Sequence, residues 1–159
     1  MSDTANCVAH YGDPAKPAFQ SKWLRIYSLP ADIAAHFPPY PGVPHVSRIQ
    51  MNTFAWEPFC AAFRELISTG LVKELKTYDG CVNLRYKRNQ AEIPANRSIH
   101  SWGLALDFNA KLNPLGVVQG SRPGMFTKAF LDVWRRHGWT AGADFRDGMH
   151  FQFTNKFPS

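Results

Sequence analysis

Two short apolar runs, Leu104–Phe108 and Met149–Phe153, constrain the fold of this chain more than any other feature. In each run a residue that can bind a metal, Asp107 in the first and His150 in the second, alternates with bulky side chains. Successive side chains of a strand point to opposite faces, so each strand is expected to bury its bulky face and present its ligand on the other. The two strands must lie close together in one sheet if both ligands are to face one cavity. The expected core side chains are Leu104, Leu106, Phe108, Met149, Phe151 and Phe153, and those expected on the opposite face are Ala105, Asp107, His150, Gln152 and Thr154.

A third residue of metal-ligand type, His100, precedes the first strand, and Gly103 between them allows the chain to bend toward Asp107. Two imidazoles and one carboxylate are ligands of a catalytic zinc site, which leaves its fourth position to water. Burying a carboxylate without a partner is costly, and a cation is the simplest compensation. We therefore expect His100, Asp107 and His150 to bind Zn²⁺, with Asp147 beside the open position as the second carboxylate that hydrolysis needs.

A closed, structural zinc site is the alternative, and it would use a fourth protein ligand, commonly a cysteine. Cys81 is the candidate for that ligand. The chain contains three cysteines, Cys7, Cys60 and Cys81, and no CxxC pair. This set does not form a disulfide framework, so each cysteine is expected to be a free thiol or a small core residue. The open, catalytic site fits the composition better.

The remaining patterns predict short elements around this site. Apolar residues at three- and four-residue steps predict helices over 53–70 and 126–137. Strands are expected over 23–27, 71–78 and 81–86, the last two joined by a turn at 79–80. Residues 1–50 are rich in proline and aromatic residues, and apart from the first strand they are expected to form an irregular wrap.

Together these elements predict an α+β fold. We expect a small central antiparallel sheet with helices on one face and the zinc cleft on the other. The length of 159 residues fits one domain, so a single domain built around the zinc site is expected over residues 1–159, with its catalytic core at about 78–154.

The chain is basic, with a formal net charge of +6, which favours contact with an anionic wall or membrane surface. Its basic residues are scattered and match no nucleic-acid reader, so no nucleic-acid partner is expected. The sequence shows no signal peptide and no apolar run of the roughly 20 residues that a transmembrane helix needs. We expect a monomer that is made in the cytoplasm and reaches any external substrate with the help of another factor.

Two motifs together resemble those of the D-alanyl-D-alanine carboxypeptidase family of zinc peptidases: Ser98-x-His100-x-x-Gly103-x-Ala105-x-Asp107 and Asp147-x-x-His150. That family includes vancomycin-resistance peptidases and the L-alanyl-D-glutamate endopeptidases of phage endolysins. The resemblance covers about residues 78–154 and implies a fold of the Hedgehog and D,D-peptidase type. Many dipeptidase members carry Glu where this chain has Asp147, whereas the phage branch has Asp, which favours the phage branch.

The resemblance also implies roles for individual residues. The histidines of both motifs and Asp107 would bind zinc, and Asp147 would take a proton from the attacking water and pass it to the leaving amine. Arg85, in a segment similar to the family's arginine-bearing strand, would stabilise negative charge on the carbonyl oxygen. The alternative role of Arg85 is a surface salt bridge. Arg97 is the second candidate for the stabilising cation. Ser98 would hydrogen-bond the substrate, or else serve only as a turn residue.

The function implied is zinc-dependent hydrolysis of an amide bond in peptidoglycan stem peptides. An endolysin that cleaves L-Ala-D-Glu is preferred, because a short chain without export signal or wall-binding module suits a lysis enzyme released to the wall. A D-alanyl-D-alanine carboxypeptidase is the alternative. A non-catalytic zinc domain that binds the cell wall, or a phage structural component, is the alternative of another class.

Overall fold

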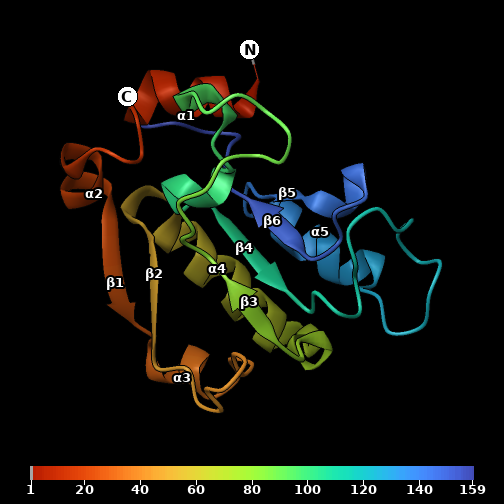
Figure 1. Cartoon of the computed structure of the whole chain (residues 1–159). Helices are drawn as coiled ribbons and strands as arrows, with labels where there is room; N and C mark the ends of the chain where they lie inside the picture. The colour runs from red at the N-terminus through yellow and green to blue at the C-terminus, as the bar shows by residue number, and fades with distance from the viewer. Residues whose placement is uncertain (1) are drawn as a thin grey trace.

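The computed structural model describes residues 2–159, which form a two-stranded and a four-stranded sheet together with several short helices (Figure 1). The α-helices are α1 (Asp3–Tyr11), α2 (Pro17–Trp23), α3 (Ala31–Ala34), α4 (Thr53–Thr69) and α5 (Lys128–Arg136). The strands are β1 (Leu24–Ser28), β2 (Arg48–Asn52), β3 (Tyr78–Gly80), β4 (Ala105–Phe108), β5 (Thr140–Ala141) and β6 (His150–Gln152). Short 3₁₀ helices are η1 (Leu71–Glu74), η2 (Pro94–Asn96), η3 (Ile99–Trp102) and η4 (Gly142–Phe145).

Both sheets are antiparallel, and the order of strands in the larger one is β3-β4-β6-β5. Strands β4 and β6 are neighbours, with Asp107 directly opposite His150 in the register. The prediction that these two strands share one sheet is therefore confirmed, and with it the expectation that both ligands lie on the same face. Strands β1 and β2 form the separate two-stranded sheet.

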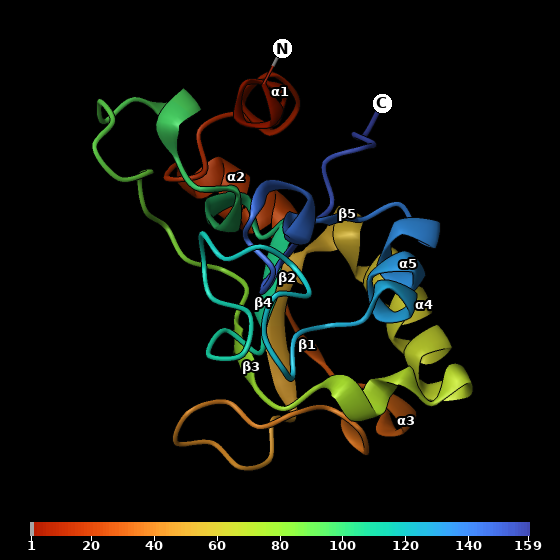
Figure 2. The same ribbon diagram turned by 90° about the vertical axis from the view of Figure 1, so that its right-hand side faces the viewer.

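Helices α4 and α5 lie together on one side of the strands, and the segment after β3 runs on the other side (Figure 2). Asn52 caps α4 by accepting a hydrogen bond from the backbone N–H of Phe54, and Thr127 caps α5 in the same manner. Aromatic rings fill the space between helices and sheet: Trp134 of α5 lies 4.9 Å from Phe151 and 6.0 Å from Phe108, measured between ring centroids. Each fully buried side chain of this size stabilises the fold by about 2–3 kcal/mol.

The predicted helices agree with α4 and α5, and the strand predicted over 23–27 agrees with β1. The prediction of an irregular wrap was wrong, because α1, α2 and α3 lie within residues 2–50 and β2 begins at Arg48. Proline disfavours the interior of a helix, yet Pro17 occupies the first turn of α2, where its missing N–H costs nothing and its φ suits a helix. Ser2 likewise begins α1 by accepting from the backbone N–H of Ala5.

The hairpin predicted over 71–86 was also wrong. Residues 71–74 form η1, and Tyr78–Gly80 pairs with β4 rather than with the segment that follows it. The pairing with β4 buries the Tyr78 ring against Phe37 and Phe108, which a surface hairpin would not do. Long-range packing therefore decided the partner of this strand.

Within residues 2–159, no helix combines the length and the apolar character needed to cross a membrane.

Candidate metal centre

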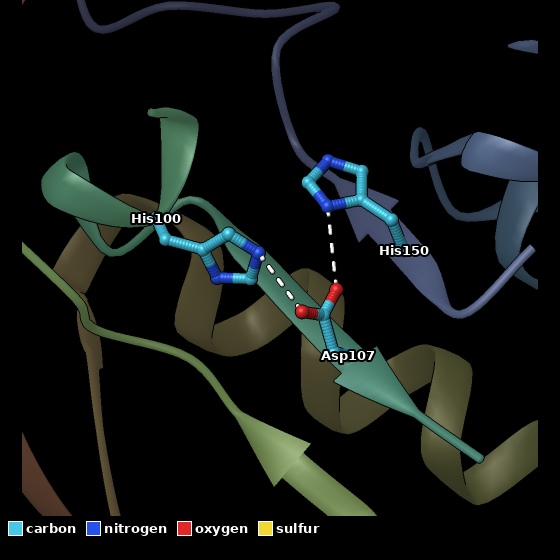
Figure 3. A group of neighbouring side chains, drawn as sticks. All are labelled: His100, Asp107 and His150. Carbon is cyan, nitrogen blue, oxygen red and sulfur yellow. Dashed lines mark ion pairs between the residues drawn. The ribbon is translucent and has the colours of Figure 1, made fainter. Parts of the chain in front are cut away.

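Three side chains from different elements converge beside β4 (Figure 3). His100 comes from η3, Asp107 from β4 and His150 from β6. His100 Nε2 lies 3.2 Å from Asp107 Oδ2, and His150 Nδ1 lies 3.3 Å from Asp107 Oδ1. The three potential ligand atoms all lie within 4.8 Å of one another. The structure thus brings together the residues that the sequence predicts as metal ligands.

The geometry of this group fits a zinc ion. When ligand atoms lie about 2.0–2.1 Å from zinc, tetrahedral coordination separates neighbouring ligand atoms by about 3.3–3.4 Å. The two nitrogen-to-oxygen distances match that separation, and an N₂O donor set is typical of catalytic zinc. Asp107 Oδ1 is buried and receives no hydrogen bond from residues 2–159, so it is an acceptor for which a cation is the natural partner.

The charges around the group also favour a cation. Burial raises the pKa of Asp107, but the adjacent imidazoles of His100 and His150 outweigh burial and lower this pKa to about 2. Burial by itself would lower the pKa of His150, but the neighbouring Asp107 carboxylate outweighs burial, so the pKa of His150 is raised. The carboxylate is therefore ionised at neutral pH and creates a negative potential between the two imidazoles.

The far nitrogen of each imidazole is held by a specific acceptor. His100 Nδ1 lies 2.7 Å from the backbone carbonyl of Cys81, and His150 Nε2 lies 2.8 Å from Gln152 Oε1. Because a carbonyl oxygen can only accept, the proton of each neutral imidazole lies on this outer nitrogen, and the inward nitrogen then keeps its lone pair. Both rings are thus oriented as metal ligands, by the kind of supporting contact that metal-binding histidines usually have.

The turn that carries His100 is fixed by residues of the motif itself and by one residue outside it. Ser98 begins η3 by accepting a hydrogen bond from the backbone N–H of His100, and Gly103 ends it with φ +67°. A Cβ at Gly103 would lie 2.8 Å from the backbone nitrogen of Asn52, which itself donates to the Gly103 carbonyl. The fully buried Asn52 side chain donates to the carbonyl of Trp102. A single residue at the end of β2 therefore anchors the whole turn.

Asp147 lies beside the ligand group, with Oδ2 3.8 Å from His150 Nδ1. Its side chain is partly buried, and burial is the main reason why its pKa is raised above the usual value for aspartate. The turn from Asp147 to His150 is closed by a backbone hydrogen bond of 3.0 Å between these residues. Gly142 packs directly under this turn, and any Cβ there would collide with the carbonyl oxygens of Asp147 and His150.

A cleft of about 600 Å³ opens over the metal-ligand group. Arg85 and Ser98, both predicted as site residues, line this cleft together with Asp147. The Arg85 side chain is exposed, and its backbone N–H donates to Ser101 Oγ, whose hydroxyl lies 3.0 Å from the Arg85 carbonyl. Ser101 therefore holds the backbone of Arg85 in place beside the metal centre, and the Arg85 side chain can extend into the cleft from this fixed position.

The other proposed residues have different placements. The guanidinium of Arg97 stacks on the Tyr86 ring, 3.8 Å from its centroid, and so Arg97 is engaged in a cation–π contact. Ser98 Oγ is used to cap η3, as the turn alternative expects, while the residue still lines the cleft. Trp102 is fully buried and donates to the carbonyl of Gly12, so it belongs to the core and not to the cleft.

Cys81 does not act as a fourth ligand. It supplies its backbone carbonyl to His100, while its thiol lies 3.7 Å from the carbonyl of Gly103 and is buried. Burial raises the pKa of the Cys81 thiol. Burial also raises the pKa of Cys7 to about 12 and that of Cys60 to about 11. All three therefore remain protonated, as expected for small core residues.

Three of the predicted side-chain orientations, on β6 and on the residues flanking it, need correction. Met149 was expected in the core but is only partly buried and lines the cleft. Gln152 and Thr154 were expected on an open face, yet both are buried, because Gln152 contacts Asp3 of α1. Asp3, Asn52 and Ser101 also support the site, and none of them is predicted from the sequence. Each is a single polar residue in no recognisable motif, and its role depends on contacts with distant segments.

The cleft continues on the side of the ligand group away from Asp147. A hollow of about 200 Å³ shares Arg85, His100 and Asp107 with the cleft, and it shares Tyr40 and Cys81 with a further hollow of about 300 Å³. Over residues 2–159, the lining of these two smaller hollows does not include Asp147. An extended groove therefore passes across the metal-ligand group.

Comparisons with known proteins give one match. A family model described as D-alanyl-D-alanine carboxypeptidase matches residues 92–153. The match includes His100, Asp107, Asp147 and His150, and it leaves out Arg85. Neither a curated protein nor a solved structure matched the chain in the corresponding searches. The motif resemblance, the ligand geometry and the family match agree, and residues 92–153 belong to the D-alanyl-D-alanine carboxypeptidase family of peptidases.

Proposed function

We propose that this protein is a zinc-dependent peptidase that hydrolyses an amide bond in the stem peptides of bacterial peptidoglycan. The observation that carries the proposal is the Asp147 carboxylate, 3.8 Å from a ligand atom of the His100, Asp107 and His150 group, in one cleft of the family-matched segment. When bound there, zinc supplies Lewis acidity, which polarises a carbonyl group and makes water more acidic.

The protein's own residues then supply the proton transfers. Burial raises the pKa of Asp147, which makes it a stronger base than an exposed aspartate. Asp147 accepts a proton from the attacking water and donates it to the leaving amine. Arg85 lines both the cleft and the adjoining hollow, where its guanidinium stabilises negative charge that grows on the carbonyl oxygen.

The charge of the cleft supports an acidic peptide substrate. Arg85, Lys87 and Arg88 all line it. Stem peptides carry several carboxylates, and a basic rim attracts such ligands and helps to orient them. This basic rim therefore favours peptidoglycan stems over neutral peptides.

The shape of the groove supports cleavage within a chain. The leaving amine must reach Asp147, so the amine side of the substrate occupies the cleft and the acyl side extends toward Tyr40. The 600 Å³ cleft offers far more room than one terminal alanine requires. We therefore favour an L-Ala-D-Glu endopeptidase of the endolysin type, with D-alanyl-D-alanine carboxypeptidase as the alternative.

Mass spectrometry of muropeptides after digestion of purified sacculi tests the proposal. Release of stems that lack L-alanine identifies the endopeptidase, and loss of one terminal D-alanine identifies the carboxypeptidase. Asp147→Asn should keep bound zinc and lower the rate by about 10²–10⁴-fold. If the zinc-loaded wild-type protein releases neither product, or if Asp147→Asn releases product at the wild-type rate, the proposal fails.

We further propose that the protein works as a monomer and reaches the wall after release from the cytoplasm. Its positive charge would favour contact with anionic wall polymers or lipids. Fractionation of producing cells before and during lysis, with sizing of the purified protein, tests both points.

A further inference from the structure

The outer nitrogen of His150 begins a chain of hydrogen bonds that ends in the first turn of α1. His150 Nε2 lies 2.8 Å from Gln152 Oε1, and Gln152 Nε2 donates to Asp3 Oδ2 over 2.6 Å. Gln152 Nε2 also donates to Thr154 Oγ1 over 2.9 Å. Asp3 thus contacts the metal centre through one intervening side chain, although it lies outside the family-matched segment.

The chemical character of each group gives this chain a direction. A carboxylate can only accept, so Asp3 holds the Gln152 amide with its NH₂ group toward α1. The amide oxygen then faces His150 and can only accept the Nε2 proton. As a result His150 keeps a lone pair on Nδ1, the atom that lies 3.3 Å from Asp107. Reversal of the amide would place a donor against Nε2 and favour the tautomer whose Nδ1 is protonated and cannot bind a metal.

The inner part of this arrangement is shielded from water, because the exposed fractions of His150, Gln152 and Thr154 are only 7%, 5% and 6%. Asp3 itself lies at the exposed start of α1 and reaches the buried Gln152 amide from outside. Helix α1 is anchored to the core: its own residue Cys7 is fully buried, and the Gly12 carbonyl that follows the helix accepts from Trp102 Nε1 over 2.9 Å. Helix α1 therefore holds the exposed Asp3 side chain at a fixed position beside Gln152.

We propose that Asp3 is a positioning residue of the metal centre, which acts through Gln152 to keep His150 in its metal-binding tautomer. The inference rests on the metal site of the proposed function but not on the reaction. Zinc affinity and the tautomer of His150 therefore test it whether or not the protein hydrolyses peptidoglycan.

The test compares zinc affinity, measured against a competing chelator, with the imidazole ¹⁵N shifts of His150 in zinc-free protein. Asp3→Ala should weaken zinc binding by about 10-fold or more, within the 10–100-fold range typical of supporting contacts, and should shift His150 toward a mixture of tautomers. Asp3→Asn keeps an oxygen that can accept from Gln152, so it should recover most of the affinity. Gln152→Met cannot accept a hydrogen bond from His150 Nε2, so it should weaken zinc binding by up to about 100-fold.

Ser2→Ala is the matched control, because it removes the cap of α1 without touching Gln152. It should leave zinc affinity and the His150 shifts near those of the wild type. The inference is overturned if Asp3→Ala binds zinc within twofold of the wild type, whatever Gln152→Met does. It is also overturned if Ser2→Ala weakens binding as much as Asp3→Ala, since loss of the helix end alone would then explain the effect.

Discussion

The family-matched segment, residues 92–153, and the chain before it contribute differently to the metal centre. The segment holds the three candidate ligands and Asp147. The preceding residues hold some of the groups that orient these ligands: Asn52 anchors the turn of His100, and the Cys81 carbonyl orients its ring. The ligands of this site are therefore local in sequence, whereas their orientation depends in part on contacts from outside the segment.

The physical reason lies in the size of the ligand-bearing elements. Strands β4 and β6 are only four and three residues long, and such short strands are not stable alone. Their buried faces depend on α4, which belongs to the preceding region, as well as on α5. The same dependence explains why the supporting groups come from distant elements.

The largest effect should follow loss of a ligand within the matched segment. His100→Ala removes one of three donors, so zinc binding should become too weak to survive purification and hydrolysis should fall to background. His45→Ala, at an exposed histidine that lines neither the cleft nor the two smaller hollows, is the control and should change neither. Metal analysis and sacculus digestion measure both quantities. Full zinc occupancy in His100→Ala would mean that the ligand group is wrongly assigned.

The second-largest effect should come from the contact between Gly103 and Asn52, which supports the turn of His100 from outside the matched segment. Gly103→Ala combines a positive φ with a Cβ 2.8 Å from the backbone of Asn52, so the free energy of unfolding should fall by about 3 kcal/mol and zinc affinity should fall with it. Gly70→Ala has a similar φ of +75° and no atom within 4 Å of its Cβ, so it should cost only about 1 kcal/mol and leave zinc affinity unchanged. Denaturant titrations and chelator competition measure the two effects. Equal losses in both variants would show that the contact between Gly103 and Asn52 contributes little.

Arg85 tests whether the preceding region also contributes to the reaction. Arg85→Ala should lower kcat by about 10²-fold with zinc content unchanged, because it removes one fixed cation from the developing oxyanion. Arg97→Ala should have a small effect, since the Arg97 guanidinium is stacked on Tyr86. Steady-state kinetics on a soluble stem peptide distinguishes the two. A larger loss in Arg97→Ala would reassign the cationic role.

The smallest effect concerns the contact between α4 of the preceding region and α5 of the segment. Glu65 of α4 accepts from Arg136 and pairs with His137 over 3.1 Å, and the Arg136 hydrogen bond is the main reason why the pKa of Glu65 is lowered. A lowered folded pKa means that this contribution is complete above the unfolded value of about 4.3 and disappears as pH falls through the folded pKa.

Glu65→Gln should therefore reduce stability by about 1 kcal/mol or less at pH 7, since the pair is partly exposed, and should match the wild type in strong acid. Denaturant titrations across this pH range measure the difference, and Glu57→Gln, on the exposed face of α4, is the control. A difference that persists unchanged in acid would show that the effect does not come from the charge of Glu65.

Much of the site could be predicted from local pattern. The alternation in residues 104–108 and 149–153 was sufficient to place Asp107 and His150 on one face, and helical periodicity was sufficient for α4 and α5. The region before residue 50 was predicted poorly, because α1 and α2 are short and are stabilised by caps and packing rather than by a long amphipathic pattern. Strand β3 was misassigned because its partner is remote in sequence.

The sequence by itself determined which chemical groups are available and on which face of its strand each ligand lies, because the two-residue period of a strand is a local property. The tertiary structure alone decided which nitrogen of each imidazole faces Asp107, that Met149 lines the cleft, and that Asp3 reaches Gln152. These features depend on hydrogen bonds between segments that are far apart in the chain. Local sequence patterns carry no information about such contacts until the fold has brought the segments together.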